Sequence, residues 1–91
     1  MEETTGKTDS RIDVLDCLAR STDGVKFRGA ARSVTLPTAN GQVQIRPGHA
    51  EAFIVMATGQ LVFESDGQPD RSLAVDGGTL LVKDNRVTVL I

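Results

Sequence analysis

The stretch that decides the fold is VTLPTANGQVQIRPGHA, residues 34–50. Its apolar side chains recur at every second position. Val34 and Leu36 are two residues apart, and so are Val43 and Ile45. A period of two is typical of strands that bury one face and leave the other in water. The stretch therefore predicts two neighbouring strands of a half-buried sheet.

Turn-forming residues separate and follow these two strands. Pro37 has no amide hydrogen and a fixed φ, so we expect it to end the strand before it and to start a turn. Asn40 and Gly41 tolerate positive φ and are expected to complete that turn. Pro47-Gly48 repeats this chemistry after the second strand. The expected result is a tight hairpin followed by a second sharp turn.

The rest of the chain continues the pattern of short apolar segments between turn dipeptides such as Asp23-Gly24, Asp66-Gly67, Gly77-Gly78 and Asp84-Asn85. A helix is arguable only over Ala50 to Ala57, and the Gly59 and strand-like run that follow favour a strand there too. Many short strands indicate an all-β protein, a small β-sandwich or flattened barrel of about 8–10 strands. The predicted strands are 12–19, 25–28, 32–36, 42–45, 52–56, 60–64, 71–75, 79–83 and 86–91.

The length of 91 residues leaves room for a single small domain. Residues 1–10 carry no large apolar side chain after Met1 and are predicted to be a disordered lead-in, so the domain is expected over 11–91. The first strand has two possible openings, Ile12 to Leu15 or Leu15 to Leu18, and Arg20 to Asp23 are expected to hold an insertion or a longer turn. A core this small is marginally stable, which favours a subunit covered by a partner.

Composition excludes several classes of function. Ten basic and twelve acidic residues give a net charge of −2, and the aromatic residues are three phenylalanines, so a nucleic-acid-binding surface is not expected. The lone Cys17 has no disulfide partner within the chain, which fits a reducing compartment. No apolar stretch approaches the about 20 residues of a membrane-spanning helix, so membrane association is expected to be peripheral, through another protein.

No motif predicts catalysis, a metal or a cofactor. Gly6-Lys7-Thr8 lacks the preceding glycine and strand of a phosphate loop. His49 is the single histidine and Cys17 lies far from it in sequence, so we expect Cys17 to be an inert core thiol. No serine sits in a nucleophile elbow, and acidic residues such as Asp70 and Asp76 are expected at turns, where they cap the backbone.

A family resemblance adds to this interpretation. The stretch 34–50 resembles the signature of epsilon subunits of F-type ATP synthases, counterparts of the mitochondrial delta subunit, in which a Pro-Thr-x-x-Gly turn leads to a Pro-Gly-His-Ala loop. Three further segments keep the family's order: Gly59-Gln60-Leu61, 75–82 around Gly77-Gly78, and 84–90, which is similar to the Asn-x-Val-Thr-Val-Leu ending of the domain. The resemblance is taken to extend over 27–91.

The resemblance implies a non-catalytic rotor subunit in the central stalk of a proton-translocating ATP synthase. It implies that Gly48, His49 and Ser21 face the gamma subunit. It also implies that the turn Thr38, Ala39, Asn40, Gly41 and Gln42 touches the ring of c subunits. The expected location is peripheral, on the cytoplasmic face of the bacterial plasma membrane.

The sequence also departs from the family pattern. Glu51 stands where the family usually has proline and Gln44 where it often has glycine, so the geometry of the His49 loop is expected to differ. Family members commonly continue into a helical hairpin, whereas this sequence stops at Ile91 and is expected to lack it, as a naturally short member or a chain cut after the sandwich.

Two other functions remain open on the residues alone. One is a stand-alone β-sandwich interaction module unrelated to ATP synthesis. The other is a small acid–base enzyme, which predicts a concave pocket at His49 with carboxylates converging on it.

Overall fold

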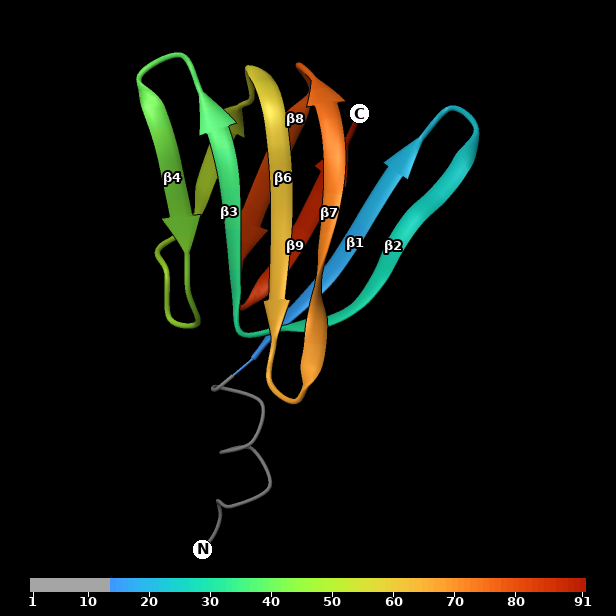
Figure 1. Cartoon of the computed structure of the whole chain (residues 1–91). Coiled ribbons are helices and arrows are strands. Elements are labelled where there is room, and N and C mark those ends of the chain that lie inside the picture. Colours follow the sequence, from blue (N-terminus) through green and yellow to red (C-terminus); the bar gives the residue numbers. More distant parts are fainter. Residues whose placement is uncertain (1–13) are drawn as a thin grey trace, which may run out of the picture.

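The computed structural model describes residues 14–91, which form two stacked β-sheets (Figure 1). The predicted lead-in, residues 1–10, lies outside the described residues. Within them there are nine strands, as the sequence predicts: β1 Leu15–Ser21, β2 Gly24–Ala31, β3 Ser33–Thr38, β4 Gly41–Ile45, β5 Ala52–Val55, β6 Thr58–Ser65, β7 Gln68–Asp76, β8 Thr79–Lys83 and β9 Arg86–Leu90.

The two sheets have different sizes and strand orders. One has five strands in the order β2-β1-β9-β8-β5, and the other has four in the order β4-β3-β6-β7. Neighbouring strands are antiparallel except β1 and β9, which run parallel. No helix occurs among residues 14–91, so the all-β prediction is confirmed, as a sandwich of two open sheets.

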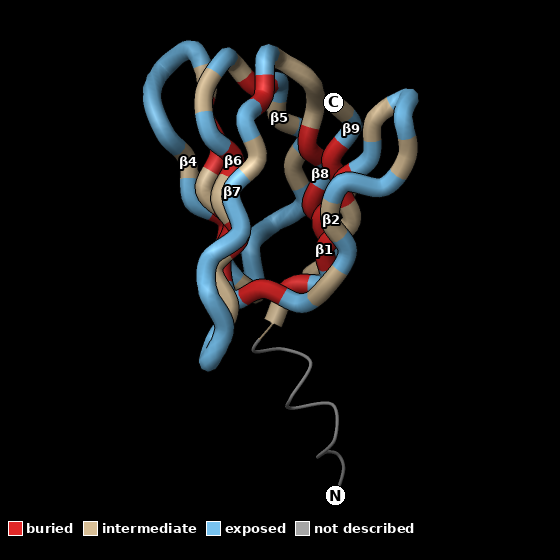
Figure 2. The backbone as a smooth tube through the Cα atoms, turned by 45° about the vertical axis from the view of Figure 1, so that its right-hand side comes forward, coloured by how far each residue is buried: buried red, intermediate tan, exposed pale blue. Residues whose placement is uncertain are grey.

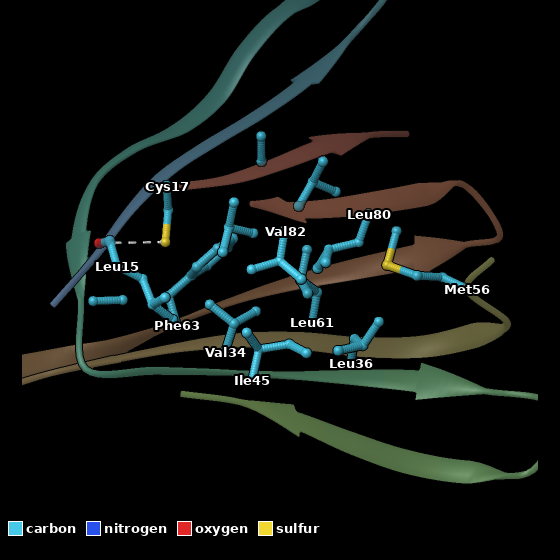
Figure 3. Packing of buried hydrophobic residues seen from close by; sticks show 14 of the residues in the cluster. Leu15, Cys17, Val34, Leu36, Ile45, Met56, Leu61, Phe63, Leu80 and Val82 are labelled. Atoms are coloured by element: carbon cyan, nitrogen blue, oxygen red, sulfur yellow. Dashed lines mark hydrogen bonds between the residues drawn. The ribbon is translucent and has the colours of Figure 1, made fainter. Parts of the chain in front are cut away.

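The core lies between the inner faces of the two sheets, where the buried stretches of the chain face each other (Figure 2). Alternate residues of each strand point inward, as the period of two requires. Figure 3 shows this cluster, in which Phe63 is the largest fully buried side chain. Its largest fully buried members are Phe63, Leu15, Leu36, Ile45, Leu61, Leu80, Val34, Val82, Val87, Val89 and Cys17.

An aromatic pair joins the two sheets where β2 approaches β6. The rings of Phe27 and Phe63 stack with centroids 4.2 Å apart and an interplanar angle of 16°. The guanidinium of Arg71 lies 5.5 Å from the centroid of the Phe27 ring, so a cation covers the outer side of the pair. These contacts close one side of the sandwich.

The first strand differs from the prediction. It opens at Leu15, which settles the two alternatives in favour of the later one, and it runs to Ser21. The expected insertion at 20–23 is wrong, because a register shift between Ala19 and Arg20 lets the strand stay paired with β2 up to the Ser21–Gly24 pair. A bulge absorbs the extra residue without ending the strand.

Pro37 does not end its strand, contrary to the prediction. β3 pairs with β6 only from Ser33 to Thr35, so Pro37 lies where the strand has lost its neighbour on one side and no amide hydrogen is required there. Its carbonyl instead accepts the amide of Ala57 at 3.0 Å. Gly41 has the positive φ expected of it, 113°.

Two further segments behave as the sequence predicts. Residues 52–55 form a strand, β5, which excludes the helix considered for this segment. At Gly78, with φ 109°, an added Cβ would lie 2.5 Å from the carbonyl oxygen of Leu90, so glycine is required there by close approach as well as by φ.

The prediction that Asp70 and Asp76 lie in turns is wrong, because β7 is longer than expected and includes both. Asp76 is the last residue of β7 and its carboxylate accepts the hydroxyl of Thr58 at 2.6 Å. Pairing with the long strand β6 extends β7 beyond the apolar run seen in the sequence.

Candidate partner-docking site

The predicted contact residues lie at two opposite ends of the sandwich. The β1–β2 hairpin, which carries Ser21, and the β3–β4 hairpin, residues 38–42, lie at the upper end in Figure 1. The loop with Gly48 and His49 lies at the lower end, between β4 and β5. The structure therefore brings Gly48 and His49 together, and places Ser21 at the far end of the molecule from them.

The His49 loop is a turn fixed by backbone and side-chain hydrogen bonds. The amide of His49 donates to the carbonyl of Arg46 at 3.1 Å, and Gly48, at φ 86°, makes the reversal possible. The Nδ1 of the exposed His49 ring lies 2.7 Å from the carbonyl oxygen of Ala50. Nδ1 is then the protonated nitrogen, since a carbonyl accepts only, and Nε2 is left facing solvent.

Asn85 is a residue of this site that the sequence analysis missed. Its Oδ1 accepts the amide of Gly48 at 2.7 Å, and its carbonyl accepts the amide of Asp16 at 2.8 Å. Asn85 has φ 61°, a left-handed conformation that asparagine adopts more readily than most residues. The sequence predicts only a turn at Asp84-Asn85, and no local signal indicates that the Asn85 side chain reaches the His49 loop.

A shallow hollow of about 420 Å³ lies beside this loop, lined by Gly48, His49, Ala50, Glu51, Lys83, Asp84 and Asn85. Two carboxylates therefore border His49, as an acid–base site would require. All of these acidic and basic side chains are exposed, and within residues 14–91 neither carboxylate hydrogen bonds to the imidazole. The hollow lacks the buried, mutually bonded groups by which enzymes tune such chemistry.

The β3–β4 hairpin is internally fixed and open to solvent at its tip. Thr38 donates its hydroxyl to the carbonyl of Gly41 at 2.6 Å and accepts the amide of Asn40 at 3.2 Å. Residues 39–42 are exposed. A tip held in one conformation costs little entropy when a partner contacts it.

Ser21 ends β1 and is half-buried. Its hydroxyl oxygen accepts the amide of Asp23 at 3.1 Å, which caps the two-residue turn to β2. The side chain therefore has a local structural role in the hairpin.

Cys17 is buried on the inner face of β1, as predicted for a core thiol. Burial away from water, with a smaller contribution from the negative charge of Asp16, raises the pKa of Cys17 from 9.0 to about 12. The thiolate, which is the reactive form, is therefore scarce near neutral pH. In the part of the chain described, no three metal-ligating side chains of the His, Cys, Asp and Glu types come together.

The outer face of the five-stranded sheet exposes large apolar side chains, a feature that the sequence analysis also missed. Phe53 and Val55 are each 66% exposed, Leu90 is 55% exposed and Leu81 is 41% exposed. A broad hollow of about 800 Å³ on this side is lined by residues of β1, β2, β8 and β9, including Asp16, Leu81, Lys83 and Thr88.

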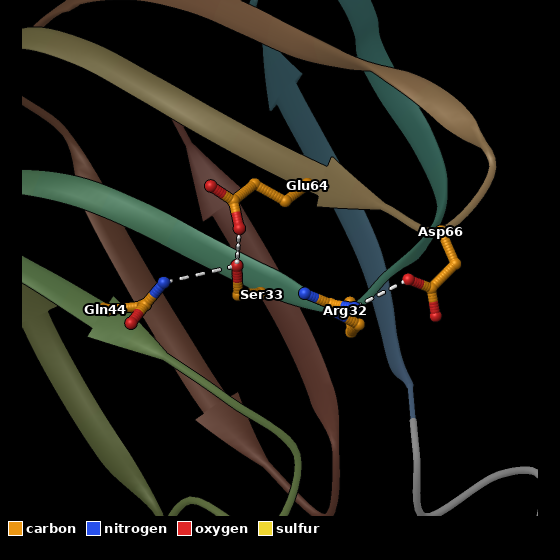
Figure 4. Close-up of polar contacts among 5 residues, drawn as sticks. All are labelled: Arg32, Ser33, Gln44, Glu64 and Asp66. Atoms are coloured by element: carbon orange, nitrogen blue, oxygen red, sulfur yellow. Dashed lines mark hydrogen bonds and ion pairs between the residues drawn. The ribbon is translucent and has the colours of Figure 1, made fainter.

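The outer face of the four-stranded sheet is polar instead. Figure 4 shows Ser33, which is 2% exposed, beneath two polar side chains. Its hydroxyl donates to Glu64 at 2.7 Å, and the amide of Gln44 lies 3.4 Å from the same oxygen. At the lower end, Arg32 and Asp66 form an exposed ion pair at 2.8 Å.

Comparison with known proteins identifies the family. The model of the ATP synthase delta/epsilon chain β-sandwich domain matches residues 17–91. The ATP synthase epsilon chain of Wolinella succinogenes is 36% identical over 67 residues, which are 74% of this chain and 51% of the relative. That of Endomicrobium trichonymphae is 31% identical over 71 residues, 77% of this chain and 50% of the relative. The chain thus spans about half the length of these curated relatives.

Solved structures share the fold at low sequence identity. A chain of the Euglena gracilis mitochondrial ATP synthase, solved as an OSCP/F1/c-ring assembly, superposes with a TM-score of 0.79 at 20% identity, covering 86% of this chain and 50% of its own. A chain of the Tetrahymena thermophila mitochondrial ATP synthase central stalk and c-ring gives a TM-score of 0.70 at 14% identity, covering 84% of this chain and 61% of its own.

Within residues 14–91 no helix is long and apolar enough to cross a bilayer.

The signature turns read from the sequence, the nine-stranded sandwich and the match of the domain model over 17–91 agree with one another. The chain belongs to the family of ATP synthase delta and epsilon chains, of which it carries the β-sandwich domain.

Proposed function

We propose that this chain is a non-catalytic rotor part of a proton-translocating F-type ATP synthase, which couples rotation of the c-ring to the gamma subunit. The β3–β4 turn, Thr38 to Gln42, contacts the c-ring, and the His49 loop together with Ser21 contacts gamma. The chain works at the membrane surface, on the cytoplasmic face of the bacterial plasma membrane, and needs no cofactor.

One observation carries this proposal: two exposed loops, each fixed by hydrogen bonds, lie at opposite ends of one sandwich. A single body can then touch two partners at once. A close-packed core transmits displacement between its ends, because its side chains have no free volume into which to shift. The relatives are named as epsilon chains, and the structures of the same fold come from assemblies that contain a central stalk or c-ring.

Reconstitution tests the proposal. An ATP synthase depleted of its epsilon chain is supplied with this chain, and gamma retention, c-ring retention and ATP-driven proton pumping are measured. His49→Asp is expected to weaken gamma retention by about tenfold while c-ring contact persists, and Asn40→Asp to do the reverse. Ser72→Asp, on the exposed face of β7, adds the same charge away from both proposed contacts and is the matched control.

The proposal fails if the unaltered chain neither retains gamma nor restores pumping. Stable co-purification with proteins outside the synthase would instead favour the stand-alone interaction module.

A further inference from the structure

The tip of the β3–β4 hairpin carries the one Asn-Gly pair of the sequence, Asn40-Gly41. Glycine has no Cβ, so its backbone nitrogen is the least hindered that can follow an asparagine and can approach the side-chain amide of that asparagine. The sequence holds one other asparagine, Asn85, and the bulky Arg86 follows it. The two asparagines are therefore a matched pair for comparing the reactivity of the side-chain amide.

The structure engages the side-chain amide of Asn85 and leaves that of Asn40 open to solvent. The Oδ1 of Asn85 accepts the amide of Gly48 at 2.7 Å. Asn40 is exposed, and its side-chain amide makes no hydrogen bond to another residue of 14–91. A Cβ added at Gly41 would meet no atom within 4 Å, so the space beside this glycine is empty. A bond between the Asn40 side chain and the Gly41 nitrogen therefore has room to form.

Exposed hydrogen bonds at the end of a sheet hold this tip in its turn. The Thr38–Gly41 pair is the last of the β3–β4 ladder, β4 is an edge strand, and β3 pairs with β6 only as far as Thr35. The hydroxyl of Thr38 accepts the amide of Asn40 at 3.2 Å and donates to the carbonyl of Gly41 at 2.6 Å. Solvent-exposed bonds at the end of an element open at low cost in free energy, so the tip leaves its turn more often than the core strands unfold.

We propose that Asn40 is a site of spontaneous deamidation, which replaces a neutral side chain at the hairpin tip by a carboxylate. The Gly41 nitrogen gives its proton to hydroxide and attacks Cγ of Asn40. The bond from this nitrogen to Cγ forms, the bond from Cγ to Nδ2 breaks, and Nδ2 takes a proton from water and leaves as ammonia. Water then opens the resulting five-membered succinimide ring, to aspartate or to isoaspartate, and returns a hydrogen to the Gly41 nitrogen. One water is consumed for each ammonia released, and no oxidant is required.

The reaction changes the electrostatics of the whole hairpin. Residues 33–45, which contain β3 and β4, carry no charged side chain, so deamidation introduces the first charge there. The isoaspartate product also lengthens the backbone by one carbon, which disturbs the hydrogen bonds that Thr38 makes across the turn. The inference does not depend on the proposed function. If the tip contacts the c-ring as proposed, a deamidated chain behaves like Asn40→Asp.

Incubation of the isolated full chain in a mildly alkaline buffer, followed by tryptic mapping with mass spectrometry, tests the inference. Trypsin recovers Asn40 within 33–71 and Asn85 within 84–86, so the two sites are followed in separate peptides. The readouts are the mass of each peptide and the ammonia released. Ammonia is needed as a readout because Asp66-Gly67, in the same peptide as Asn40, can form isoaspartate without releasing it.

In the folded chain Asn40 is expected to convert at least about tenfold faster than Asn85, and faster as the pH rises, because the attacking nitrogen has to lose its proton. Asn40→Gln is the matched variant: it keeps an exposed amide but requires a six-membered ring, so the ammonia released from 33–71 should disappear. Thr38→Val removes the hydroxyl that holds the turn and is expected to speed the conversion by about two- to tenfold, the factor that corresponds to one hydrogen bond.

Three outcomes decide the matter. If Asn40 stays intact in the folded chain but converts in urea, the turn protects it and the inference is wrong. Equal rates at positions 40 and 85 in the folded chain would also overturn it, since the tip would then have no special reactivity. Failure of the proposed function has a different result: the isolated chain still deamidates at Asn40, and the rate stays the same when gamma and the c-ring are supplied.

Discussion

The two sheets have similar inner faces and different outer faces. Inside, both contribute fully buried aliphatic side chains to a single core. Outside, the four-stranded sheet presents the polar group around Ser33, whereas the five-stranded sheet exposes the apolar side chains of Phe53, Val55, Leu81 and Leu90. Strands that are apolar on both faces are expected where both faces are covered, and among the two sheets it is the five-stranded one that approaches this pattern.

The largest expected effect separates the inner face from the outer one. Phe63→Ala leaves a cavity in the core and removes the stack with Phe27, so we expect the free energy of unfolding to fall by about 3–5 kcal/mol. Phe53→Ala is the matched change on the outer face, where the ring is 66% exposed, and should cost less than about 1 kcal/mol.

Urea denaturation of the isolated chain measures both variants. Equal losses of stability at positions 53 and 63 would show that the outer ring is covered by the chain itself, and the contrast between the two faces would disappear.

The next effect concerns the upper end of the five-stranded sheet. Gly78→Ala places a methyl group 2.5 Å from the carbonyl oxygen of Leu90 at a positive φ, so we expect a loss of about 2–4 kcal/mol. Gly24→Ala has a similar φ, 123°, with no atom within 4 Å of the added Cβ, and should lose about 1–2 kcal/mol. Thermal unfolding measures the difference, which is the cost of the clash; equal losses would mean that the end of β9 moves aside freely.

Asn85 tests how firmly the His49 loop is attached to the five-stranded sheet. Asn85→Gly keeps the backbone conformation and removes the side-chain acceptor of the Gly48 amide, so we expect a loss of about 0.5–1.5 kcal/mol and faster amide exchange at Gly48. Asn85→Ala adds the cost of a positive φ and should lose about 1 kcal/mol more. Unchanged exchange at Gly48 in the glycine variant would mean that the loop holds its shape without Asn85.

The smallest effect comes from the ionisation of Cys17 and is expected at alkaline pH, not at neutral pH. The pKa of Cys17 is raised from 9.0 to about 12 in the folded chain, so both states are protonated well below pH 9 and the thiol has no effect there on the pH dependence of stability. Above pH 9 the unfolded chain loses a proton that the folded chain keeps, and stability should fall by up to about 1.4 kcal/mol per pH unit. Cys17→Ala should lack this component in urea denaturation at about pH 8 and about pH 10. An identical alkaline slope in both proteins would show that water reaches the inner face of β1.

Strands whose own residues alternate between apolar and polar were predicted from the sequence. Strand ends that are set by pairing with a neighbouring strand were misplaced. The pairs Val34–Leu36 and Val43–Ile45 predict β3 and β4, because a period of two is a local property. The ends of β1 and β7 were missed, because the bulge at Ala19 and Arg20 and the long pairing of β7 with β6 depend on the facing strand. Pro37 stays in its strand for the same reason, since whether a missing amide matters depends on what lies beside it.

The sequence by itself determined the all-β class, the turn chemistry around Gly41, Gly48 and Gly78, and the family, because each is written in the order and spacing of residues. Only the tertiary structure decided that Ser21 and His49 lie at opposite ends, that Asn85 holds the His49 loop, and which outer face gathers the exposed apolar side chains. Those features join residues far apart in the chain, Gly48 to Asn85 and Phe53 to Leu81, and such pairings arise only when strands choose their neighbours and register.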